Sequence, residues 1–203
     1  MSKRTRLPAA ERRELIAGVA TEVFADHGYH GASIDEIARR AGVSAPVVYD
    51  HFASKQQLYE RLLERTRDEL LEMWREHLFS DEPAEVRIPR AIEAWAAYVE
   101  THPYASRMYF REATGVPEVQ AFHREVQAQA RAALTAILAR EPGAEGLAGS
   151  GDPLALEMAA EVIRSALTGL AIWWNDHPEV PRERIVTTAL NVIWFGFERS
   201  RRE

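Results

Sequence analysis

The sequence predicts an all-α protein of about nine helices. Apolar residues recur every three or four positions over most of the 203 residues, and no segment alternates polar with apolar residues as a half-buried strand would. Prolines and glycines separate the periodic segments, as expected where helices begin and end.

The first helix is predicted over residues 9–27, with Gly28 following its last position. Ser33 then offers a side-chain oxygen to cap a second helix, and Glu36 three residues later completes a capping box. Gly42 permits the left-handed backbone that ends a helix, so we expect the second helix to stop there.

A third helix is predicted over residues 45–51, directly after that turn. Ser44 is a second N-cap residue, and Pro46 falls in the first turn, where its missing N–H leaves no bond unmade. Two short helices joined by a glycine turn form a helix-turn-helix, whose second helix enters the DNA major groove. A helical hairpin that only packs against the rest of the chain is the alternative.

The fourth helix is predicted over residues 54–78, with Ser54 as its N-cap, and it is long enough to join two parts of the chain. Further helices are expected over residues 84–102 and 104–113, from residue 117 to a glycine-rich loop at 142–153, and over residues 154–175 and 181–199.

Residues 7–62 also resemble the DNA-binding domain of the TetR family of transcriptional regulators. The likeness rests on Ile37-Ala38, Ala41-Gly42-Val43-Ser44, Val48-Tyr49, His51-Phe52 and Ser54-Lys55. It implies a DNA-binding domain over residues 1–53 and an effector-binding and dimerisation domain over residues 54–203. It further implies a repressor that binds a palindromic operator as a homodimer and is released by a small effector.

The charge distribution agrees with a DNA-binding N-terminus. The net charge is −6, yet residues 1–67 hold 11 Lys and Arg against 9 Asp and Glu, and residues 68–203 hold 14 against 22. Lys3, Arg4 and Arg6, followed by Arg12 and Arg13, form a basic arm that can follow phosphates or enter a minor groove. A solvated tail is the alternative. The chain has no cysteine, no signal-peptide pattern and no long apolar run, so we expect a cytoplasmic protein that does not enter a membrane.

The DNA contacts are predicted from side-chain reach and from the resemblance. By reach, Ser33, Tyr49 and His51 can donate to phosphate oxygens, and Lys55 stands where family members use a lysine to hold phosphate. Ser44, the N-cap residue of the third helix, is a further predicted DNA contact. Base edges or thymine methyl groups would meet Ala45, Pro46 and Val47. Two residues depart from the family pattern: Val47 replaces a common Thr, Ser or Ala, and Asp50 brings a negative charge that can accept from cytosine. Arg39 and Arg40 are either backbone contacts or a solvated pair.

The aromatic residues lie mainly on helices that enclose an effector cavity in TetR-like proteins. They predict an apolar or aromatic effector, with His123, Arg107 or Arg111 as polar anchors for an acid. Ordinary core packing is the alternative for each single residue. The predicted effector-binding residues are Trp95, Tyr98, Met108, Tyr109, Phe110, Phe122, His123 and Trp173.

The last two helices carry apolar residues over more than one face, which is typical of helices covered on both sides. The resemblance implies that the same helices of a second copy cover them, whereas an internal helix pair in a monomer is the alternative. The predicted interface residues are Met158, Val162, Leu167, Leu170, Leu190, Ile193, Trp194 and Phe197.

An enzyme is the competing class of protein. His27 and His30 have the spacing of some metal ligands but flank Gly28 at a helix end, which favours a structural role. The sequence contains no phosphate-binding glycine loop, nucleophile elbow or paired-carboxylate motif. We therefore expect no enzymatic activity, cofactor or metal, and a DNA-binding regulator without an effector remains a further alternative.

Overall fold

The computed structural model describes residues 7–111, 116–140 and 152–200, without the side chains of residues 153 and 194–200. These ranges contain nine α-helices and no strand, so the predicted all-α class is confirmed. Their bounds are α1 Ala9–Gly31, α2 Ile34–Ala41, α3 Ala45–His51, α4 Lys55–Leu78, α5 Ala84–Thr101, α6 Pro103–Phe110, α7 Pro117–Leu138, α9 Pro153–Asp176 and α10 Arg182–Ser200. Within the described part, no helix combines the length and the apolar character needed to cross a bilayer.

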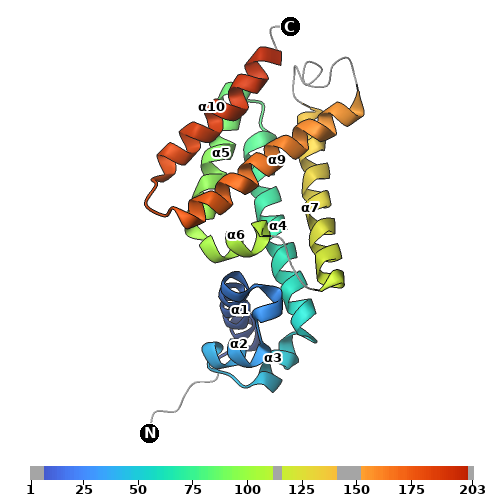
Figure 1. Ribbon diagram of the computed structural model, residues 1–203, viewed down its shortest axis with the longest axis vertical. Helices are drawn as coiled ribbons and strands as arrows, with labels where there is room; N and C mark the ends of the chain where they lie inside the picture. The colour runs from blue at the N-terminus through green and yellow to red at the C-terminus, as the bar shows by residue number, and fades with distance from the viewer. Residues whose placement is uncertain (1–6, 112–115, 141–151, 201–203) are drawn as a thin grey trace.

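The helices form a small group at one end and a larger group at the other. Figure 1 shows α1, α2 and α3 together near the N-terminus, with α4 extending from them into the group made by α5, α6, α7, α9 and α10. One buried apolar cluster nevertheless runs from Ile16 of α1 to Ala189 of α10. Because the core is continuous, the predicted boundary between residues 53 and 54 stays a prediction.

Helix α1 has its regular part where the sequence predicts it. Ile16, Ala20 and Val23 are completely buried on one face. At Gly28 the backbone leaves the helix, with φ 67° and ψ 174°, and a last turn follows to Gly31. The predicted end after residue 27 therefore coincides with a break at a glycine that alone tolerates this conformation without strain.

The turn between α2 and α3 has the predicted geometry. The Ser33 hydroxyl oxygen accepts a hydrogen bond from the Glu36 N–H at 3.2 Å. Gly42 adopts the left-handed conformation, with φ 67° and ψ 28°, and the Val43 N–H donates to the Ala38 carbonyl at 3.0 Å. The second half of the predicted capping box is wrong, because the Glu36 carboxylate accepts from Arg40 at 2.7 Å instead of from the backbone of Ser33.

Helix α4 begins and ends as predicted. The Ser54 hydroxyl accepts from the Gln57 N–H at 3.0 Å, which satisfies one of the unpaired N–H groups of the first turn. Leu58 and Leu63 are fully buried near its start, and Leu70 is buried further along. The same helix thus takes part in the core at both ends of the molecule.

One later helix ends earlier than predicted. Helix α6 ends at Phe110 rather than at residue 113, because Arg111 is already extended at φ −77° and ψ 137°; residues 112–115 lie outside the described part. The segment between α9 and α10 is fixed by the Trp174 indole N–H, which donates to the Val180 carbonyl at 2.8 Å. The glycine-rich loop predicted over residues 142–153 lies almost wholly outside the described residues.

Replacing Gly42 by alanine should destabilise the protein by about 1–2 kcal/mol, because an L-residue is strained at this positive φ. Gly18 of α1 provides the matched control, since a Cβ there would meet no atom within 4 Å. Gly18→Ala should stabilise the protein by up to about 1 kcal/mol, because alanine favours a helix. Urea unfolding at one fixed protein concentration measures both changes, and an equal response of the two variants would contradict the assigned turn.

Candidate DNA-binding surface and effector cavities

One face of α3 packs against the core, and the opposite face is exposed to solvent. Val48 is completely buried beneath it, and Ala45 and Val47 pack partly against the core. Ser44, Pro46, Tyr49 and Asp50 are exposed, as is Ser33 at the start of α2. The Ser44 side chain makes no capping hydrogen bond, so its hydroxyl is available to another acceptor.

Arg13 of α1 fixes the end of α3. Its guanidinium donates to the His51 carbonyl at 3.0 Å and lies 4.5 Å from the centre of the Phe52 ring. The sequence places Arg12 and Arg13 in a basic arm, but both belong to α1. Lys3, Arg4 and Arg6 lie outside the described residues.

Lys55 at the start of α4 has contacts within the protein. Its ammonium donates to the Ala32 carbonyl at 2.8 Å and lies 4.5 Å above the Tyr29 ring. Burial lowers the pKa of Lys55 below its ordinary value. The lysine therefore joins α4 to the segment before α2, and two of its three N–H donors remain for other partners.

Charged residues connect α2 to α6 through the end of α1. Asp26 of α1 accepts from Arg107 of α6 at 3.2 Å and lies 3.9 Å from Arg40 of α2. Arg40 also pairs with Glu36, and the His27 Nε2 atom lies 3.6 Å from the Glu36 carboxylate. The His27 ring therefore lies beside this group of charges. Arg107, predicted as an effector anchor, instead joins the two groups of helices.

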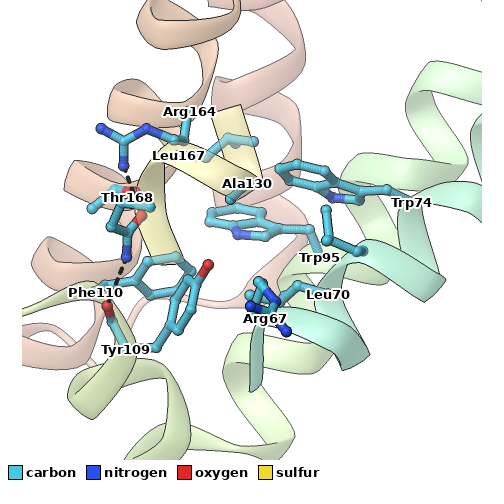
Figure 2. A pocket seen from close by; sticks show the side chains of 12 residues that line it. Arg67, Leu70, Trp74, Trp95, Tyr109, Phe110, Ala130, Arg164, Leu167 and Thr168 are labelled. Atoms are coloured by element: carbon cyan, nitrogen blue, oxygen red, sulfur yellow. Dashed lines mark hydrogen bonds between the residues drawn. The ribbon is translucent and has the colours of Figure 1, made fainter. Parts of the chain in front are cut away.

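Two small apolar cavities lie between α4 and the helices around it. The first has a volume of about 20 Å³ and is lined chiefly by α4, α5, α6, α7 and α9, with Trp95, Tyr109 and Phe110 among its walls. The second has a volume of about 60 Å³ and is lined by apolar side chains only. Figure 2 shows Trp74 and Trp95 on one flank of the first cavity, with Tyr109 and Phe110 on the other.

A much larger cleft, of about 970 Å³, lies between α7 and α9. Its walls carry Arg111, Arg124, Arg131 and Arg164. Arg131 and Arg164 pair with Glu161, whose pKa is lowered mainly by its hydrogen bond to Arg164. Within the described residues, no carboxylate pairs with Arg111 or Arg124.

The basic cleft and the first cavity share a wall. Phe110, Gln127, Arg164 and Thr168 line both. Gln127 accepts from Arg164 at 3.0 Å and donates to the Tyr109 carbonyl at 3.1 Å, and dashed lines in Figure 2 mark both bonds. A hydrogen-bonded side chain thus separates the polar cleft from the apolar interior.

The predicted effector-binding residues fall into separate places. Trp95, Tyr109 and Phe110 line the first cavity, and burial raises the pKa of Tyr109 to about 12. His123 lines the cleft and its Nε2 lies 3.0 Å from the Tyr109 carbonyl.

The other predicted members lie apart from these walls. Tyr98 donates to Glu69 at 2.7 Å, and its burial raises its pKa; Met108 is buried, and Phe122 packs against the core. Trp173 is 45% exposed and lines neither apolar cavity, since its face of α9 points away from both. Its ring stacks on that of His177.

The sequence reasoning missed several lining residues. Trp74 and Leu70 occupy regular apolar positions on α4, which do not by themselves distinguish a cavity wall from ordinary core. Arg164 and Gln127 lie 37 residues apart in the sequence, and only the crossing of α7 and α9 brings them together. The indole N–H of Trp95 is buried and has no hydrogen-bond partner among the described residues.

Helix α9 has an outward apolar face. Leu154, Met158 and Val162 are more than half exposed, and Trp173 and Val192 of α10 continue the surface. Ala166 and Gly169, also exposed, complete the spacing along α9. Met158 and Val162, two of the predicted interface residues, therefore lie on an exposed face of α9.

The other predicted interface residues do not all share this face. Leu167 is only 4% exposed and lines both apolar cavities, so its predicted place on an outer face is not what the structure shows. Leu190 and Ile193 pack partly against the core, and Leu170 does the same. The side chains of Trp194 and Phe197 lie outside the described part.

A capped α2, a left-handed glycine turn and an exposed α3 supported on a buried base define a helix-turn-helix DNA-binding protein. The comparisons with known proteins give the family. Residues 16–62 match the profile of the bacterial regulatory proteins of the tetR family. The transcriptional activator FasR of Mycolicibacterium smegmatis is 33% identical over 192 residues, which cover 94% of this chain and 85% of that protein. The chain belongs to the TetR family of transcriptional regulators.

Solved structures agree in fold along nearly the whole chain. A TetR-like regulator from Rhodococcus sp. RHA1 has a TM-score of 0.74 at 24% identity and covers 94% of this chain and 98% of its own. The FadR regulator of Bacillus subtilis, solved in complex with stearoyl-CoA, has a TM-score of 0.73 at 18% identity over 91% of this chain and 97% of its own.

Proposed function

We propose that this TetR-family regulator binds a palindromic operator as a homodimer, and that a long-chain acyl compound with an anionic headgroup controls its operator affinity. The observation that carries the effector class is the wall that the basic cleft shares with the first apolar cavity. The protein could act in this way as a repressor, which the family resemblance implies, or as an activator, which is how the 33% identical relative is named. Operator binding places the protein in the bacterial cytoplasm.

The exposed side of α3 supplies the operator contacts. Tyr49 and Ser44 offer hydroxyl groups to phosphates, while Pro46 and Asp50 stand where they can meet bases. Arg13 positions the helix by holding the His51 carbonyl. One short helix buries little DNA, and therefore a two-fold dimer that presents two such helices is needed for tight, specific binding.

The outward apolar face of α9 supports the dimer. Leu154, Met158 and Val162 are spaced by four residues, so they form one stripe along the helix. An apolar stripe of this length facing water is unfavourable and is typical of a surface that a partner covers. A second copy of the chain offers the same stripe, as a two-fold interface requires.

The cleft and cavities support an amphiphilic effector. Arg111 and Arg124 offer guanidinium groups to an anionic headgroup, because neither is neutralised by a described carboxylate. The chain would pass Gln127 into the apolar cavities, where the unpaired Trp95 indole N–H can donate to a carbonyl oxygen. Both cavities are far smaller than the roughly 300 Å³ of a typical ligand site, so binding must displace side chains. The stearoyl-CoA bound to the Bacillus subtilis FadR structure has the same chemistry.

Operator binding is tested first. Selection from random duplex DNA should enrich a palindrome whose half-sites lie about one helical turn (~10 base pairs) or a multiple apart. Operator affinity is then measured by fluorescence anisotropy with and without palmitoyl-CoA, for which a change of roughly 5- to 150-fold is expected. Palmitoyl-CoA affinity should change by the same factor when operator is saturating, and unchanged affinity would exclude acyl control.

Replacing Lys55 by methionine should weaken binding to the operator and to unrelated DNA alike. If the remaining N–H donors of Lys55 contact phosphate, the magnitude of the salt slope should fall by about one, since one fewer counterion is released. Arg75→Ala is the control, because Arg75 is an exposed cation near the far end of the same helix. If the variant has a lower melting temperature but an unchanged salt dependence of DNA affinity, Lys55 does not contact phosphate and only anchors the Ala32 carbonyl.

Replacing Val162 by arginine should weaken the dimer at least about tenfold, because a charge would be buried in an apolar interface. Leu15→Arg is the matched control, since Leu15 is an exposed apolar residue on α1, away from α9. Sedimentation velocity over a range of concentrations measures the dissociation constants. A wild-type monomer at micromolar concentration, or an unaffected Val162→Arg dimer, would argue against this interface.

A further inference from the structure

The two apolar cavities meet at a wall of two side chains. Trp74 of α4 and Leu167 of α9 line both cavities, and every other lining residue belongs to one cavity alone. Figure 2 shows the Trp74 ring reaching the first cavity beside the Trp95 ring. An elongated molecule in the first cavity therefore meets this wall before it can reach the second cavity.

Of the two side chains, Trp74 is the one that can move. Leu167 is 4% exposed and lies within the main buried cluster, so its displacement would disrupt the close packing of that cluster. Trp74 is only partly buried, and it packs against both the main cluster and the smaller cluster of Leu134, Leu138 and Ala160. An indole at the boundary of two clusters has an outward path that a fully enclosed leucine lacks.

The position of Trp74 on α4 connects it to the DNA-binding end. Roughly three to four and a half turns before it on the same helix, Leu63 and Leu58 are fully buried in the core that α1 shares. An α-helix transmits a displacement along its axis because its backbone hydrogen bonds resist bending. A displacement of the Trp74 side chain can therefore displace α4, which carries Lys55 and supports α3.

We propose that Trp74 is a chain-length gate: short acyl chains stop at its ring, whereas long chains displace it, enter the second cavity and shift α4. This inference rests on the proposed function, since it assumes that the acyl chain enters from the basic cleft. The second cavity is lined by apolar side chains alone, which suits the end of an alkyl chain and offers no partner to a polar group. Short chains then bind without a change in operator affinity, and long chains bind and change it.

The test uses the full-length protein and a series of probes, from octanoyl-CoA through lauroyl-CoA to stearoyl-CoA. Calorimetry gives the affinity for each probe, and anisotropy at saturating probe gives the operator affinity. For the wild type we expect binding at every length but a change in operator affinity, of roughly 5-fold or more, only beyond a threshold length.

Trp74→Leu opens the wall and keeps an apolar residue, and Trp74→Phe keeps a ring as the conservative variant. The leucine variant should bind stearoyl-CoA at least as tightly as the wild type but lose most of the operator response. The phenylalanine variant should retain the threshold. Met73→Leu is the matched control, because Met73 precedes Trp74 on α4 and packs against the core but lines neither cavity. It should keep the threshold, and melting curves confirm that each variant is folded.

The outcomes separate the two proposals. Binding of every chain length with equal operator responses in the wild type would overturn the gate while leaving acyl control intact. A Trp74→Leu protein that keeps the wild-type threshold would also overturn the gate. If the wild type binds no acyl-CoA of any length, the proposed effector class fails, and the gate fails with it.

Discussion

The burial of α4 along most of its length is the constraint on which the arrangement depends. Leu58, Leu63 and Leu70 are each at most 5% exposed, and they belong to one cluster that reaches from α1 to α10. Burying each such leucine contributes roughly 2 kcal/mol, so separating α4 from either group of helices would cost much of the stability of a protein of this size. The two groups consequently cannot change position without moving this helix.

The local parts of the fold could be predicted because their causes lie within a few residues. Ser33, Gly42 and Ser54 cap or end helices through bonds to atoms three or four residues away, and the structure has them as predicted. The same reasoning assigned Glu36 to the wrong partner, since Arg40 one turn later competes for its carboxylate. Helix bounds are therefore readable from sequence even where a particular hydrogen bond is not.

The candidate sites were less predictable because they depend on which face of a helix meets which neighbour. Helix α9 is apolar on more than one side, and nothing in its sequence tells that Leu167 turns inward while Val162 and Trp173 turn outward. Arg13 and Lys55 read as phosphate contacts, yet both also hold backbone carbonyls distant in sequence. The shared wall of cleft and cavity exists only through the crossing of α6, α7 and α9, which no local pattern records.

The contact between Asp26 and Arg107 gives the helix-turn-helix a second attachment to the rest of the molecule. The first is α4, and the second runs from α6 through Asp26 to the neighbourhood of Arg40 on α2. This second attachment does not pass through α4, because it joins α6 directly to the end of α1 and, through Asp26, to α2. A displacement of α6 can therefore reach the helix-turn-helix even where α4 keeps its place.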